Sequence, residues 1–272
     1  MLGFDKKSSA LEGISLLRLK YFLLHFLQKY SFKNSNGMIF LSDYAYDFLH
    51  ENYFSVVSQP KKTVIPIGVD KFGYDINDFN YRENNDKDPL RILYVSTVRN
   101  YKHQWNLIYA FIDVIKKGYN IELHLVGGGD KSAINKMKKA INKADIFKDN
   151  IFYHGNIEHD KIAEFYRNSD IFAYPSSCEN LPAIVLEAMS FGLPIISSNV
   201  RPMTDILGNS ALYFNHENID SISSCIEKII NSKSLREKMS LKVYNLSKKY
   251  SWKKCAHKTF SFIKEIVNDH QL

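Results

Sequence analysis

The feature that most constrains the fold is the alternation of apolar, strand-like segments with helical segments across residues 91–250. The first such segment, RILYVST at 91–97, is almost continuously apolar, which is typical of a strand buried on both faces of a parallel sheet. Strands are predicted at 91–97, 121–126, 150–154, 170–174, 194–198 and 211–214. Helices are predicted at 104–117, 131–145, 158–168 and 182–191, and over residues 217–270. This order predicts the α/β class, with a doubly wound, Rossmann-like parallel sheet covered by helices on both faces.

The N-terminal part of the chain contains elements of the same kind. Residues 10–31 are predicted as a helix, GMIFLS at 37–42 as a strand, and Ser42 as the cap of the helix that follows. KTVIPIGVD at 62–70 is predicted as a further strand. Residues 71–90 are polar, contain clusters of Asp and Asn, and show no periodicity. We therefore interpret them as a linker.

Charge and cysteine content narrow the choice of partners and compartment. The net charge is +7 and the pI is near 9.0, which fits either a lysine-rich surface or attraction to anions such as nucleoside diphosphates and anionic lipid. No aromatic RNA-binding motif, zinc-finger spacing or basic helix accompanies the charge, so no nucleic-acid partner is expected. Cys178, Cys225 and Cys255 fit neither a disulfide framework nor a CxxC site, which favours a reducing cytoplasm.

The N-terminal region is not predicted to be a signal peptide or a membrane span. Its first five residues lack the succession of basic, apolar and small residues that marks a signal peptide. The most apolar stretch, residues 14–28, is interrupted by Arg18, Lys20 and His25 and is too short and too charged to span a bilayer. We expect an amphipathic helix packed on its domain, with contact at an anionic membrane surface as the alternative.

The stretch SSCENLPAIVLEAMSFGLPIISSN, residues 176–199, combines two carboxylates with a helix start just beyond a predicted strand. In doubly wound sheets, ligands bind beyond the carboxyl ends of the strands. Pro182 suits a first helical turn, and the amides around it favour a bound phosphate. Glu187 leans back toward the same helix end and is suited to accept hydrogen bonds from ribose hydroxyls. Glu179 lies on the other side of the phosphate position, where a hexose presents hydroxyls. As isolated residues, both glutamates would be interpreted as surface charges near a helix dipole.

Two further loops at the same end of the sheet carry cations and glycines. TVRNYKHQWNLI, after the first strand, places Arg99 and Lys102 where they would neutralise a diphosphate and stabilise its departure. HLVGGGD at 124–130 places three glycines after a strand, which lets backbone approach a ligand closely. The glycines do not match GxGxxG, so nicotinamide binding is not favoured.

Together these residues resemble the donor-binding half of retaining GT-B glycosyltransferases of family 4, the glycosyl transferases group 1. The stretch ENLPAIVLEAMSFGLPIISS carries the resemblance and matches the E-x7-E region of that family. Supporting stretches are ILYVSTVRNYKHQWNLIYAF, HLVGGGD, FYHGNIEHDKIAEFYRNSDIFAYPS and GMIFLSDYA…VIPIGVD. The resemblance covers nearly the whole chain in the order of the family.

The resemblance implies a nucleoside-diphosphate sugar as donor, retention at the anomeric carbon, and no obligatory metal or cofactor. Carried over by position, Glu179 contacts the transferred sugar, Glu187 the ribose and Lys102 the diphosphate. Arg99 joins the catalytic set as a substitute for a family arginine whose position is occupied here by Thr97. Backbone near Asn156 and Ile157 meets the base, the amides of Asn180 and Leu181 meet the distal phosphate, and Ser96 and Gly128 complete the donor-binding set.

The resemblance also interprets the domain organisation. Residues 1–70 correspond to the C-terminal part of an acceptor-side Rossmann-like domain, 91–250 to the nucleotide-sugar domain, and 251–272 to a C-terminal helix that packs back toward the N-terminal domain. Most of the acceptor-side domain has no counterpart in this sequence. The implied activity is transfer of a hexose to a glycan or lipid-linked acceptor in surface polysaccharide, lipopolysaccharide or glycolipid synthesis. The implied place is the cytoplasm, with association at the inner face of the cell membrane as an option.

Two other functions stay open at this point. A chain without the acceptor half would bind a nucleotide sugar without transferring it, and a GT-B epimerase would interconvert a free sugar nucleotide without an acceptor. The DxD sequence at 86–88 lies in the linker rather than at a strand end, so we interpret it as a solvated charge cluster. His103, His124, His154 and His159 are interpreted as structural or solvated residues.

Overall fold

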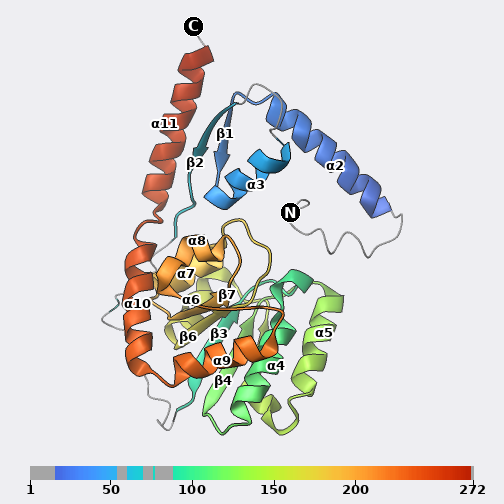
Figure 1. Ribbon diagram of the computed structural model, residues 1–272, viewed down its shortest axis with the longest axis vertical. Coiled ribbons are helices and arrows are strands. Elements are labelled where there is room, and N and C mark those ends of the chain that lie inside the picture. The colour runs from blue at the N-terminus through green and yellow to red at the C-terminus, as the bar shows by residue number, and fades with distance from the viewer. Residues whose placement is uncertain (1–15, 54–59, 70–75, 77–87, 271–272) are drawn as a thin grey trace. The chain divides into compact units, whose positions relative to one another are not determined.

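The computed structural model describes residues 16–53, 60–69, 76 and 88–270, which fall into two compact units (Figure 1). Unit 1 consists of the described residues up to Gly68 together with those from Trp252 onward. Unit 2 consists of the described residues from Val69 to Ser251. The candidate site lies within unit 2, and the elements of unit 2 position its side chains.

Unit 2 is built around a six-stranded parallel sheet with the order β5-β4-β3-β6-β7-β8. The strands are β3 (Leu90–Val95), β4 (Ile121–Val126), β5 (Ile151–Gly155), β6 (Ile171–Tyr174), β7 (Ile195–Ser198) and β8 (Leu212–Phe214). Every residue of β6 and β7 is buried, because both strands lie inside the sheet and helices cover its faces. The predicted α/β class and the doubly wound parallel sheet are confirmed.

Helices cover both faces of this sheet. Their bounds are α4 (Gln104–Ile115), α5 (Lys131–Asn142), α6 (His159–Arg167), α7 (Ala183–Ser190), α8 (Met203–Leu207), α9 (Ile219–Ile230) and α10 (Lys233–Ser247). Short 3-10 segments are η2 (Asn100–Lys102), η3 (Asp145–Asn150) and η4 (Gly208–Ser210). Because crossovers between parallel strands are right-handed, α4 and α5 lie on one face and α6 and α7 on the other. Helix α9 packs on α4, and α10 packs on α7.

A buried arginine of α10 binds the C-terminal end of α9. Arg236 of α10 is only 1% exposed, and its Nη1 donates to the carbonyls of Ile229 (2.9 Å) and Ile230 (2.8 Å). These carbonyls belong to the last turn of α9, where no later residue of the helix can donate to them. Arg236 therefore ends α9 and joins it to α10.

Unit 1 is smaller and contains a two-stranded parallel sheet of β1 (Gly37–Phe40) and β2 (Lys61–Val64). Its helices are α2 (Leu16–Lys33), α3 (Asp43–Tyr53) and α11 (Trp252–His270). Met38, Phe40 and Ala45 form a small core. The Oγ of Ser42 accepts a hydrogen bond from the N–H of Ala45 (3.2 Å), which confirms the predicted cap of α3. Helix α11 packs against β1.

Several predicted boundaries differ from the structure. The predicted strand at 62–70 ends at Val64, because Pro66 has no N–H with which to extend the ladder. The helix predicted at 131–145 ends at Asn142, and Asp145 has a φ of 52°, which a right-handed helix does not accommodate. The region after β7, predicted as a loop, contains α8 and η4. Most of the predicted linker and the start of the predicted first helix lie outside the described residues.

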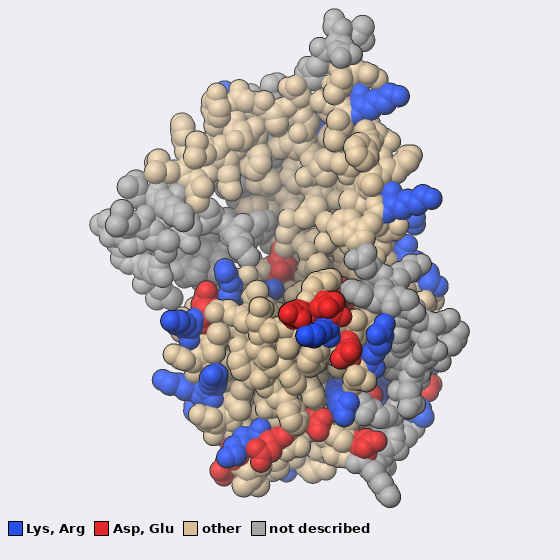
Figure 2. Space-filling model, turned by 180° about the vertical axis from the view of Figure 1, so that it is seen from behind, with Lys and Arg blue, Asp and Glu red and all other residues tan. Residues whose placement is uncertain are grey.

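Charged side chains of both signs are interspersed on the face of unit 2 seen in Figure 2, so the net charge of +7 does not gather there into one basic patch. This distribution does not resemble the basic stripe that marks a nucleic-acid surface. Within the part of the chain that the structure describes, none of the helices combines the length and the apolar character that crossing a membrane would require.

Candidate functional site

The candidate site lies at the carboxyl ends of β3 and β6, which are neighbours in the sheet. From β3 the chain proceeds through β4 and β5 toward one edge, and from β6 it proceeds through β7 and β8 toward the other. The chain therefore runs toward opposite edges of the sheet after β3 and after β6, and such a switch point is the usual ligand position in a doubly wound sheet. The loop after β3 carries Lys102, and the loop after β6 carries Glu179.

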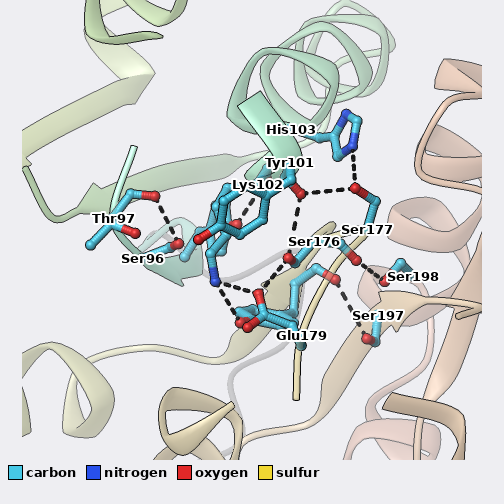
Figure 3. A network of polar contacts seen from close by, with 12 residues as sticks. Ser96, Thr97, Tyr101, Lys102, His103, Ser176, Ser177, Glu179, Ser197 and Ser198 are labelled. Atoms are coloured by element: carbon cyan, nitrogen blue, oxygen red, sulfur yellow. Dashed lines mark hydrogen bonds and ion pairs between the residues drawn. The ribbon is translucent and has the colours of Figure 1, made fainter. Parts of the chain in front are cut away.

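Lys102 and Glu179 form an ion pair that is almost closed to solvent (Figure 3). Their side chains are 6% and 12% exposed. The Nζ of Lys102 also donates to the phenol oxygen of Tyr174 at 3.0 Å, and the Oγ of Ser176 donates to Oε1 of Glu179 at 2.5 Å. The structure thus joins two residues that the sequence analysis assigned to different parts of a donor. It also adds Tyr174 and Ser176, which that analysis did not single out.

Two buried tyrosines contact Lys102. Burial, followed by the charge of Glu179, holds the pKa of Tyr174 well above its ordinary value. Burial likewise raises the pKa of Tyr94, whose hydroxyl donates to the backbone carbonyl of Lys102 at 2.8 Å. Both phenols therefore stay protonated at neutral pH. Both phenols are therefore neutral hydrogen-bonding groups beside the Lys102–Glu179 ion pair.

The two loops are also joined through their backbones. The carbonyl of Tyr101 accepts from the N–H of Ser177 at 2.8 Å and from the Oγ of Ser177 at 3.2 Å. On the far side of this loop, the Oγ of Ser198 at the end of β7 donates to the carbonyl of Ser176 at 2.5 Å. Three neighbouring strands, β3, β6 and β7, therefore hold the segment that presents Glu179.

Helix α7 starts four residues after Glu179, and Pro182 caps it with extended backbone. The Pro182 carbonyl accepts from the N–H of Val185, whereas the N–H groups of Ala183 and Ile184 have no carbonyl one turn earlier within the helix. Such a helix start attracts anions. Asn180 is exposed and Leu181 is half-buried just before it.

Glu187 lies one turn into α7 and is held by a tyrosine of α6. The hydroxyl of Tyr166 donates to Oε2 of Glu187 at 2.9 Å, and Nε2 of His159 lies 3.8 Å from Oε1. Burial, followed by the charge of Glu187, keeps the pKa of Tyr166 well above its ordinary value, so this phenol is a permanent donor. The Glu187 side chain is 17% exposed, which leaves part of the carboxylate accessible to a ligand.

The glycine loop after β4 packs closely on the loop after β3. Gly127 has a φ of 129°, and a Cβ there would lie 2.0 Å from the carbonyl oxygen of Ser96, so only glycine fits. Gly129 makes the same kind of approach to Val98. At these two positions the close contact is with the chain's own backbone. At Gly128 a Cβ would meet Asn156 at 3.4 Å, an ordinary contact.

The remaining predicted residues lie in the segments after β3 and β5. Ser96 is 5% exposed, and its Oγ donates to the carbonyl of Thr97 at 3.0 Å. Asn156 is exposed and Ile157 half-buried in the loop after β5. The Nε of Arg99 lies 3.9 Å from Oδ2 of Asp130, at the end of the glycine loop, in an exposed ion pair. Within the described residues, no group of three or more His, Cys, Asp or Glu is arranged to hold a metal ion.

Sequence reasoning missed the residues that support the charged pair rather than the pair itself. Tyr94 and Tyr174 were predicted only as apolar strand residues. The nearly continuous apolar pattern of these strands contains no signal that their hydroxyls meet Lys102. The serines of PSSCEN and IISSN do contain one, because hydroxyls that follow directly after buried strands often bond to neighbouring loops.

The fold of the chain is that of the GT-B glycosyltransferases, as comparison with solved structures shows. A sucrose-phosphate synthase from Thermosynechococcus elongatus superimposes with a TM-score of 0.79 at 18% identity, over 97% of this chain and 65% of that chain. The pneumococcal O-GlcNAc transferase GtfA, in complex with UDP and GlcNAc, gives a TM-score of 0.71 at 18% identity, over 88% of this chain and 47% of that chain.

The family follows from the sequence itself. The sequence model described as "Glycosyl transferases group 1" matches residues 75–245, more than half of the chain, and the chain belongs to this family of glycosyltransferases. A capsular polysaccharide biosynthesis glycosyltransferase, CapM of Staphylococcus aureus, is 28% identical over 235 residues, which are 80% of this chain and 58% of CapM. An O-antigen chain mannosyltransferase B of Escherichia coli is 30% identical over 114 residues, or 42% of this chain and 30% of that protein.

The chain spans about three fifths of the length of the first relatives it matches, 58% of CapM and 61% of the Staphylococcus aureus protein CapJ. Members of this family bind nucleotide-sugar donors and acceptors. The matched region includes the whole six-stranded sheet and every residue of the candidate site.

Proposed function

We propose that this protein is a retaining glycosyltransferase that transfers a hexose from a nucleoside-diphosphate sugar to a glycan or lipid-linked acceptor. The observation that carries the proposal is the buried Lys102–Glu179 pair at the topological switch point, beside the start of α7. A cation, a carboxylate and a set of helix-start amides at one end of the sheet suit the diphosphate and the sugar of one donor molecule.

Lys102 is the group that stabilises the leaving diphosphate in this proposal. An ammonium has three N–H donors, and the described partners Tyr174 and Glu179 account for two of them. The third is available for a phosphate oxygen. Because the site is nearly dry, a charge there acts more strongly on the developing negative charge than it would in water. The amides of Ala183 and Ile184, with those of Asn180 and Leu181, would bind the distal phosphate.

The carboxylates bind neutral parts of the donor, because a carboxylate beside a diphosphate would repel it. Glu179 would accept hydrogen bonds from the transferred sugar, and Glu187, held by Tyr166, from the ribose. Backbone near Asn156 and Ile157, with Ser96 and Gly128, would surround the base. Arg99 would leave its exposed ion pair with Asp130 and bind the diphosphate of the donor.

The acceptor and the location are inferred from the names of the relatives. The names of the relatives mention capsular polysaccharide and O-antigen chains, which supports a surface polysaccharide or a glycolipid as product. Such acceptors are assembled on lipid carriers, so we place the protein in the cytoplasm, with peripheral contact at an anionic membrane. The sugar, the base and the linkage are not specified by these residues.

Calorimetric titration and a transfer assay test the proposal together. UDP, GDP and their glucose and mannose derivatives are titrated into the wild type, Lys102→Met and Glu179→Gln. We expect one nucleoside diphosphate to bind the wild type and Lys102→Met to weaken it by about tenfold or more, since a charge-assisted hydrogen bond is lost. Lys117→Met is the matched control, because Lys117 forms an exposed pair with Glu227. Equal binding by wild type and Lys102→Met would overturn the assignment.

A second candidate is binding of a nucleotide sugar without transfer. Donor binding with neither transfer nor hydrolysis, in a mixture containing polyprenyl-phosphate-linked acceptors, would support this candidate. Release of nucleoside diphosphate that depends on acceptor would exclude it.

A further inference from the structure

His103, the residue after Lys102, is held in an unusual backbone conformation. Its φ is 50° and its ψ is 34°, the left-handed region that costs free energy for a residue with a Cβ. Among the described residues, Asp145 is the only other non-glycine residue with positive φ. Glycine would adopt this conformation without cost. The free-energy cost of this backbone conformation indicates that the His103 side chain makes a contact that offsets it.

That contact is with the loop of Glu179. Nε2 of His103 lies 3.0 Å from Oγ of Ser177, and the same Oγ donates to the carbonyl of Tyr101. A serine hydroxyl has a single hydrogen, so Nε2–H of His103 is the donor to Ser177 in this arrangement. The ring is supported on its other sides by His216, with centroids 4.7 Å apart, and by Trp105 at 6.1 Å.

The hydrogen bond joins the two loops beside their catalytic candidates. Figure 3 shows that Lys102 and His103, adjacent in sequence, point in different directions, the first to Glu179 and the second to Ser177. Ser177 precedes Glu179 by two residues. The Tyr101 carbonyl and the His103 imidazole therefore hold Ser177 at two points, and Glu179 follows on a short connection from this fixed residue.

We propose that His103 is a positioning residue, whose imidazole fixes the 176–179 loop so that Glu179 meets Lys102 in the geometry that the donor requires. With this left-handed backbone, the ring of His103 lies against Ser177. The consequence for turnover rests on the proposed function, whereas the consequence for the loop does not.

The test compares two substitutions, His103→Gly and His103→Gln. The first should weaken the loop contact without lowering the thermal midpoint, and the second should keep the loop contact. His103→Gly relieves the backbone and removes the ring, so the thermal midpoint should stay equal or rise. Amide exchange of Ser177 should become about tenfold faster, and kcat should fall about tenfold with little change in the KM for the donor. His103→Gln keeps a donor near the Nε2 position and should retain both loop protection and kcat, with no gain in the midpoint.

Asp145→Gly is the matched control, because it relieves the same kind of backbone in η3, outside the candidate site. It should raise the midpoint without altering exchange at Ser177. If His103 were only a structural residue, loop protection and activity would follow the midpoint across all variants, and the proposal would be wrong. Unchanged Ser177 exchange in His103→Gly would also overturn it. If the wild type neither binds nor transfers a donor, the proposed function fails while the exchange data still decide on the loop.

Discussion

The two units of this protein differ in how completely they bury their apolar side chains. Unit 2 has six strands with helices on both faces, and residues such as Phe111, Phe172 and Phe191 are fully buried. Unit 1 has two strands in its described part, and large apolar side chains of its helices face solvent. A two-stranded sheet is marginal in water unless more strands or helices cover it. The comparison teaches that unit 2 contains its own core and can hold a rigid site.

Most of the exposed large apolar side chains in the described part of unit 1 lie on two helices. On α2 they are Phe22, Leu23, Phe26, Leu27 and Tyr30, and on α11 they are Phe260, Ile263 and Val267. Residues at these spacings share one side of a helix. The sequence of α2 contains no acidic residue. This composition is compatible with the peripheral membrane contact proposed above.

The largest expected effect comes from a matched pair of phenylalanines, one in each unit. Phe111 on α4 is 0% exposed and Phe260 on α11 is 73% exposed. Phe111→Ala should lower the free energy of unfolding by about 3–5 kcal/mol, because it removes a buried ring and leaves a cavity. Phe260→Ala should change it by less than about 0.5 kcal/mol. Urea denaturation of both variants measures the difference, and similar losses would contradict the contrast between the units.

A second prediction concerns cations. Arg236→Met in unit 2 should cost about 2 kcal/mol, because the buried carbonyls of Ile229 and Ile230 lose their donor. Lys61→Met in unit 1 removes exposed ion pairs with Glu265 and Asp269 and should change the same denaturation curve much less than Arg236→Met does. If Arg236→Met left the free energy of unfolding unchanged, Arg236 would not be needed to satisfy the last carbonyls of α9.

The smallest expected effect is the response to pH. Burial lowers the pKa of His124 on β4 and of His154 on β5. The Nδ1 of His124 lies 3.1 Å from the Nε2 of His154. Above pH 6.5 both are neutral in the folded and the unfolded chain, and their contribution to stability is fully present. As pH falls below 6.5 the unfolded chain takes up protons first, so stability declines until the lower folded pKa values are passed. The loss should stay below about 1 kcal/mol, since both rings are partly solvated.

Denaturation of the wild type and of His124→Phe between pH 7.5 and 5 measures this term. The variant should show a shallower dependence than the wild type. Unit 1 offers the opposite sign, because hydrogen bonds to Glu265 and Asp269 raise the pKa of Lys61. That contribution is present below pH 10.5 and is lost as pH rises through the folded pKa. A wild-type protein that gains stability between pH 6.5 and 5 would contradict the histidine account.

The fold was largely predictable because its signal is local. Continuous apolar runs such as 91–97 and 170–174 identify buried parallel strands, and the helices between them follow from periodicity and caps. Helix α8 was missed because five residues are too few to show a period. The strand predicted at 62–70 was too long, because the apolar pattern continues past Pro66. Pro66 has no N–H to donate to the neighbouring strand, and β2 ends at Val64.

The site was predictable as a set of loops and not as a network. Lys102 and Glu179 follow strands that the sequence places far apart, and only the strand order makes these strands neighbours. Sequence reasoning therefore found both charges and did not pair them with each other. The packing of Gly127 against Ser96 depends on the same long-range order. The roles given to these residues in donor binding stay predictions until a ligand is observed.

A crystal structure of the protein with a bound nucleoside diphosphate tests the central claim most directly. UDP or GDP, whichever binds in calorimetry, is added to the wild type. The account predicts a distal phosphate oxygen about 3 Å from Nζ of Lys102 and a second within hydrogen-bond distance of an amide at the start of α7. A diphosphate bound elsewhere, with Lys102 still engaged only by Tyr174 and Glu179, would contradict it.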